Sequence, residues 1–186
     1  MRYFVIVALL LISSTAFAQR NNCDSIVWSS FRKLTWADYK ARPVTASRIA
    51  SLTHFSFVHS WHVDDNVLIA QVICIFNPCQ SWTKNNQSAE LLEHEQAHFD
   101  IAEYFRRVYN KRIAHEHYTP TTLPLITLKT YVDIQLECAR IEDAYDEETS
   151  HGLNQSKQRE WIARVGKLLA SVDEYDKVEM RVNLNR

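Results

Sequence analysis

Glycine is scarce in this chain of 186 residues: there are only two, and neither lies in a glycine-rich loop of the kind that cradles a phosphate. An excess of charge of one sign is also lacking, because 21 Lys and Arg residues nearly balance 22 Asp and Glu residues. A net charge near zero argues against nucleic acid or an anionic membrane surface as the partner. Internal repeats and low-complexity segments are absent as well. These absences favour an ordinary globular domain.

A long hydrophobic run occurs only at the start of the chain. Met1-Arg2 gives a positive start, and residues 3–12 are apolar but too few to span a bilayer with ease. Residues 16–18 (Ala-Phe-Ala) then form a small-x-small cleavage site. We therefore predict a secretory signal peptide at 1–18 and a single secreted or periplasmic domain at 19–186. An uncleaved anchor is the alternative, but no later segment is apolar enough to make a membrane a partner after cleavage.

The four cysteines all lie in the predicted exported part, at Cys23, Cys74, Cys79 and Cys138. An even number of cysteines in an oxidising compartment favours disulfides. Zinc bound by cysteine is less favoured, because no pair has the CxxC spacing. Spacing does not determine connectivity. We prefer Cys74 with Cys79, which are close in sequence, and Cys23 with Cys138.

The secondary-structure signals separate into early strands and late helices. Residues 51–61 alternate in polarity, residues 67–76 form a β-branched apolar run, and a turn signal lies between them, so a β-hairpin is expected. Helical patterns follow. They run from after Asn85-Asn86 to about His115, from about Leu128 to Thr149, and from about Gln155 to Leu169. We predict an α+β fold in which an N-terminal hairpin or small antiparallel sheet packs on a three-helix layer.

The first of these helical segments contains His94-Glu95-Gln96-Ala97-His98, a HExxH pattern. Two imidazoles four residues apart project from one face of a helix, so both can reach the same metal ion. The intervening Glu95 would then lie beside that ion, where it can take a proton from a metal-bound water. The alternative is a chance match in a chain rich in His and Glu. We favour the zinc-hydrolase interpretation, with His94 and His98 as Zn²⁺ ligands and Glu95 as the base.

The position of this motif around the helix supports the same interpretation. At about 100° per residue, His94 and His98 share the sector of Ile101 and Phe105, which is the apolar stripe. Both histidines therefore point inwards. Two buried imidazoles one turn apart are costly without a shared partner.

A catalytic zinc usually has a third protein ligand and one open position. His151 is our candidate, because the following Gly152 favours a left-handed helix end that would fix its position near the first helix. The alternative is a histidine that is merely favoured near a helix C-terminus. Other candidates for the third ligand are Glu137, Glu142, Glu147, Glu148, His115 and His117.

Three blocks of the sequence resemble a family of predicted secreted zinc-dependent proteases of bacteria, a domain family largely without assigned function. The blocks are 34–39 with 42–43, then 81–82 with 91–101 and 103–107, and 145–152 with Gln158 and Trp161. The resemblance implies a zincin-like metallopeptidase with His94 and His98 as ligands and Glu95 as base. It also favours His151 as the third ligand, because the family pattern has a histidine-glycine pair there.

The predicted function is hydrolysis of peptide bonds in a peptide or protein substrate by a Glu95-activated, zinc-bound water. Tyr145, close to His151, is a candidate to stabilise the oxyanion, with packing as its competing role. Two alternatives remain open: a zinc amidase that acts on cell-wall peptides, and a non-catalytic exported protein with a structural zinc. The sequence predicts no oligomeric state.

Overall fold

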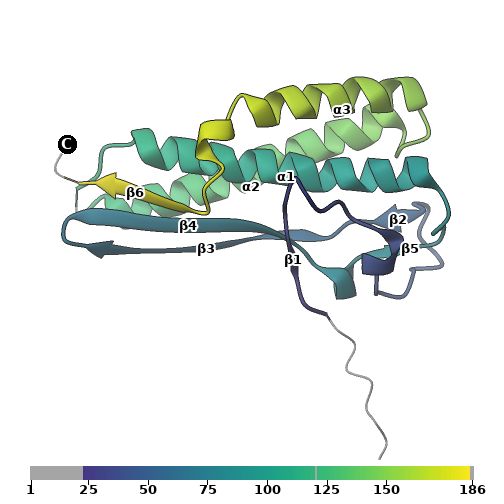
Figure 1. Cartoon of the computed structure of the whole chain (residues 1–186), viewed down its shortest axis with the longest axis horizontal. Coiled ribbons are helices and arrows are strands. Elements are labelled where there is room, and N and C mark those ends of the chain that lie inside the picture. Colours follow the sequence, from purple (N-terminus) through teal and green to yellow (C-terminus); the bar gives the residue numbers. More distant parts are fainter. Residues whose placement is uncertain (1–22, 120, 185–186) are drawn as a thin grey trace, which may run out of the picture.

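The computed structural model describes residues 23–119 and 121–184, so the predicted signal peptide lies outside the described residues. Three helices lie along one face of an antiparallel sheet (Figure 1). The α+β class is therefore confirmed, with most of the strands before the helices and one strand after them. No helix within the described ranges is long and apolar enough to cross a membrane.

The elements follow one another in a simple order along the chain. The strands are β1 (Ile26–Val27), β2 (Ser51–Leu52), β3 (Phe55–Asp64), β4 (Val67–Phe76), β5 (Trp82–Thr83) and β6 (Glu179–Asn183). The α-helices are α1 (Ala89–His115), α2 (Leu123–Thr149) and α3 (Gln155–Ala170). Short 3₁₀ helices are η1 (Trp36–Asp38), η2 (Pro78–Gln80) and η3 (Asp173–Tyr175).

The predicted hairpin is formed by β3 and β4, which pair along their whole length from Phe55 opposite Phe76 to Asp64 opposite Val67. Its two-residue turn has both φ angles positive, as tight hairpins between right-twisted strands require. The first strand was expected to begin at residue 51. Residues 51–52 instead form β2, which pairs with β5. The chain between β2 and β3 is held by the backbone N–H of His54, which donates to the Ser81 hydroxyl.

Two strands at the ends of the chain complete the sheet and were not predicted. Both pair with the edge of β4 opposite β3: β1 lies against its end, and β6 lies against its start. β1 has only two residues and β6 has five, so neither carries a strong alternating pattern. Their pairing depends on contacts between distant parts of the sequence.

Helix α1 lies at the centre of the fold, in contact with β4 and β6 on one side and with α2 and α3 on the other. The N-cap residue before it is Ser88, whose side chain accepts a hydrogen bond from the Leu91 backbone N–H at 3.0 Å. Because the helix is covered on several faces, even Glu103 is buried, paired with Arg106 and Arg107. The HExxH residues therefore lie on a helix that packs against other elements on several sides.

One disulfide is present among the described residues, and it joins Cys23 to Cys79. Our predicted pairings, Cys74 with Cys79 and Cys23 with Cys138, are wrong. The β1–β4 pairing helps to explain the observed bond: Ile26 lies opposite Phe76, so the segment before β1 and the segment after β4 start side by side, and Cys23 and the η2 residue Cys79 each lie three residues beyond this pair. Cys74 and Cys138 are buried free thiols on β4 and α2.

Candidate metal centre

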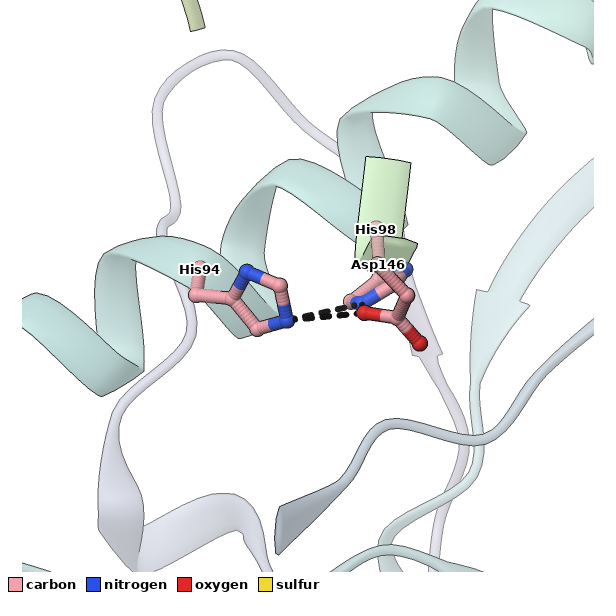
Figure 2. Close-up of side chains that lie close together, drawn as sticks. All are labelled: His94, His98 and Asp146. Carbon is pink, nitrogen blue, oxygen red and sulfur yellow. Dashed lines mark hydrogen bonds and ion pairs between the residues drawn. The ribbon is translucent and has the colours of Figure 1, made fainter. Parts of the chain in front are cut away.

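The two histidines of the HExxH motif converge on a carboxylate of α2, Asp146 (Figure 2). The Nε2 atoms of His94 and His98 each lie 3.1 Å from Asp146 Oδ1, and they lie 3.2 Å from one another. Zinc held tetrahedrally by nitrogen and oxygen at about 2.0–2.1 Å places its ligand atoms roughly 3.3 Å apart. The spacing of the three atoms therefore fits three corners of a zinc tetrahedron.

The outer nitrogen of each imidazole has its own hydrogen-bond acceptor. His94 Nδ1 lies 3.1 Å from Gln158 Oε1, and His98 Nδ1 contacts Glu142 Oε2. An Nδ1–H that donates to an oxygen leaves the Nε2 lone pair free, which is the tautomer that ligates a metal. Two such lone pairs and one carboxylate oxygen then face a common point. These three groups could hold a metal ion.

The carboxylates around the converging ligand atoms favour positive charge there. Burial alone would lower the pKa of His98, but the carboxylates of Glu142 and Asp146 outweigh it and raise the pKa well above its usual value. Burial would likewise raise the pKa of Asp146, yet its contacts with the imidazoles of His94 and His98 bring it well below its usual range. The protein thus places an ionised carboxylate against two imidazoles in a largely buried position.

Glu95, which follows His94 on α1, is also buried, with 4% of its surface exposed. Its Oε1 accepts a hydrogen bond from the hydroxyl of Ser51 on β2. A pocket of about 150 Å³ opens next to both residues. The pocket is lined by residues 49–53 together with Leu91, His94, Glu95, His98, Glu142, Asp143, Asp146 and His151. The predicted base and the predicted ligands therefore share one pocket.

His151 reaches this pocket through an unusual helix end. Helix α2 stops at Thr149, and the next three residues, Ser150, His151 and Gly152, all have positive φ, at 50°, 53° and 80°. The His151 side chain is 56% exposed, and its Nδ1 lies 3.3 Å from Asp146 Oδ2. We expected His151 to supply the third ligand atom beside His94 and His98, but Asp146 Oδ1 lies there instead. His151 contacts the other oxygen of the Asp146 carboxylate, Oδ2. A role for His151 as a ligand stays a prediction.

Tyr145 is fully buried and does not line the pocket. Its ring stacks on His94 with centroids 4.7 Å apart, and its hydroxyl donates to Gln158 Oε1 at 2.8 Å. These contacts are those of the packed aromatic that we named as the competing role. None of these contacts of Tyr145 supports the predicted role in stabilising an oxyanion.

The remaining candidates for the third ligand lie in other surroundings. Glu142 holds the outer nitrogen of His98, Glu137 pairs with Arg112, Glu148 accepts from the Trp161 indole, and Glu147, His115 and His117 are exposed. The sequence analysis missed Asp146 as a candidate ligand, as well as Gln158 and Ser51. One signal was available: Glu142 and Asp146 are one helical turn apart, the same spacing as the two histidines they contact.

Gly152 packs directly against His94, which yields a testable prediction. A Cβ at this position would lie 3.0 Å from His94 Cγ. The backbone φ of Gly152 is 80°, which disfavours any residue other than glycine. We expect Gly152→Ala to cost about 1–3 kcal/mol of stability and to weaken metal binding by displacing the imidazole. Gly166→Ala is the matched control, because its Cβ meets nothing within 4 Å and the site is helical. It should be neutral or stabilising by up to about 1 kcal/mol.

Thermal unfolding and zinc titration of both variants measure the two effects. Equal stability and equal zinc affinity for Gly152→Ala and Gly166→Ala would show that this contact does not position His94.

Comparisons with known proteins do not place the chain in a family: no family model, no curated protein and no solved structure matches it. The resemblance to the protease family therefore stays a prediction. The chemistry of the site has to be argued from its own geometry.

Proposed function

We propose that the protein is a zinc-dependent hydrolase of peptide bonds that acts outside the cytoplasm. His94, His98 and Asp146 would hold the ion. The observation that carries this proposal is the convergence of two imidazole Nε2 atoms and one carboxylate oxygen within 3.2 Å of each other. Catalytic zinc sites have three protein ligands with nitrogen or oxygen donor atoms and keep a fourth coordination position for water.

Glu95 is the proposed general base, and its support is that it is buried and lines the same pocket as the three ligand residues. When bound, zinc lowers the pKa of water and polarises a carbonyl group. Glu95 takes the proton from the attacking water and delivers it to the leaving amine. Ser51 donates to one carboxylate oxygen of Glu95, which fixes the direction of the side chain and leaves Oε2 for the proton. The proposed base and two of the three proposed ligands thus come from neighbouring residues of helix α1, and the third ligand comes from α2.

A metal-binding protein without catalytic activity is the second candidate, and His151 is the observation that favours it. Structural zinc sites are closed by four protein ligands, whereas catalytic sites keep a position for water. His151 Nδ1 contacts the second oxygen of Asp146 and lines the same pocket. A small movement of this exposed side chain would supply a fourth ligand and close the site.

Activity measurements on the zinc-loaded protein separate the candidates. We expect it to cleave an unfolded protein substrate, to lose that activity when a chelator removes zinc, and to regain it when Zn²⁺ is returned. Cleavage of cell-wall peptide fragments with no cleavage of unfolded proteins would identify the amidase alternative. A protein that binds zinc with one-to-one stoichiometry and cleaves neither substrate would overturn the enzymatic proposal in favour of the structural one.

A further inference from the structure

Helix α2 carries apolar side chains on two opposite faces. One face, which includes Ile134 and Cys138, is buried in the core. The opposite face carries a second row of apolar side chains at intervals of three and four residues. These are Leu125 (68% exposed), Leu128 (59%), Val132 (43%) and Leu136 (53%). A helix of a monomer normally turns a polar face to solvent, so a second apolar stripe indicates a partner surface.

The spacing of this outer stripe, with intervals of three, four and four residues, is close to symmetrical. Leu125 and Leu136 lie at its two ends, about 16 Å apart along the helix, and Leu128 and Val132 lie between them. Two antiparallel copies of α2 that cross near Thr130 would set each Leu125 against Leu136 of the second copy. The same crossing would set Leu128 against Val132 of the second copy. The stripe is therefore complementary to itself under a two-fold axis, as an isologous dimer requires.

The charges beside the stripe have the same symmetry. Lys129 and Asp133 flank the crossing point and form an ion pair within the chain. Because they are equally spaced about residue 131, each Lys129 would face Asp133 of the second copy in the antiparallel arrangement. Both residues lie on the same side of the stripe, so in a parallel arrangement those of the two copies would lie on opposite sides of the interface and would not face each other. Opposite charges across the crossing thus select the antiparallel pairing.

We propose that the outer stripe of α2 is the interface of an antiparallel homodimer of this chain. The occupant of the stripe is a second copy, because both the apolar spacing and the flanking charges match the chain itself. This inference does not depend on the metal site.

Sedimentation of the purified full chain tests the proposal. We expect a monomer–dimer equilibrium at roughly 1–100 µM, since a small interface built on one helix gives modest affinity. Val132→Glu should raise the dissociation constant at least about tenfold, because it buries charge in the centre of the interface. Val63→Glu on β3 is the matched control: Val63 is 45% exposed, close to the value for Val132, and lies off the stripe. It should leave the dimer unchanged.

A charge exchange tests the orientation of the two helices. Lys129→Glu and Asp133→Lys should each dissociate the dimer, and a one-to-one mixture of the two variants should associate again as a heterodimer. Both residues are on the surface, so folding is checked by equal melting temperatures. Three results would overturn the proposal: a wild-type monomer throughout this concentration range, a dimer that survives Val132→Glu, or a mixture that does not associate. A monomer that binds lipid vesicles through this stripe would overturn it in favour of a membrane surface.

Discussion

Replacing Asp146 with asparagine is expected to lower zinc affinity by more than about 100-fold, which exceeds the usual effect of losing an outer-shell partner. The substitution preserves the shape of the side chain but removes the negative charge that both imidazoles contact at 3.1 Å. Competition with a chromogenic chelator measures the affinity directly. Asp143→Asn is the matched control, because this carboxylate is exposed and lines the same pocket without contacting either histidine. It should bind zinc like the wild type.

The same titration of His151→Ala separates the two candidates for the third ligand. We expect it to lose much less affinity than Asp146→Asn, because His151 Nδ1 contacts the outer oxygen of the carboxylate and not the three converging atoms. Wild-type affinity in Asp146→Asn together with a severe loss in His151→Ala would contradict the geometry and make His151 the third ligand of the ion. Severe losses in both variants would indicate four protein ligands and favour the structural candidate.

Replacing Glu95 with glutamine should abolish most of the hydrolytic activity and leave zinc bound. The amide has the same shape but accepts no proton, and loss of a general base costs roughly 10²- to 10⁴-fold in rate. The Ser51 hydroxyl can still donate to the amide oxygen, so the side chain should keep its position. The measurement is kcat on an unfolded protein substrate, with zinc content determined on the same sample.

Glu93→Gln is the control for this substitution. It makes the same chemical change two residues earlier on α1, at an exposed position outside the pocket. Its activity should match the wild type. Full activity in Glu95→Gln would refute the assignment of the base, whereas equal losses in both variants would point to a general effect on helix α1.

The elements that could be predicted from the sequence are those specified by neighbouring residues. The hairpin of β3 and β4 has its alternation and its turn within a short stretch, and each helix shows its own apolar period. The inward orientation of His94 and His98 also follows from spacing within one helix. These features were predicted with small errors at their boundaries, such as a second helix that begins at Leu123 and not near Leu128.

The features that escaped prediction require two distant segments to be placed against each other. The Cys23–Cys79 bond depends on the register of β1 on β4, and β1 is too short to be recognised. Asp146 meets the histidines only because α2 packs beside α1 at one particular register. His151 was predicted to lie at a left-handed helix end, and it does. The direction of its side chain relative to Asp146 depends on three consecutive positive φ angles.

X-ray absorption at the zinc edge of the full chain, followed by a crystal structure of the same zinc-loaded protein, tests the metal centre most directly. We predict a zinc ion bound to Nε2 of His94, Nε2 of His98 and Oδ1 of Asp146, with a water in the remaining position and no sulfur ligand. Zinc bound through Cys74 or Cys138, or a protein that takes up no zinc while folded, would contradict the account.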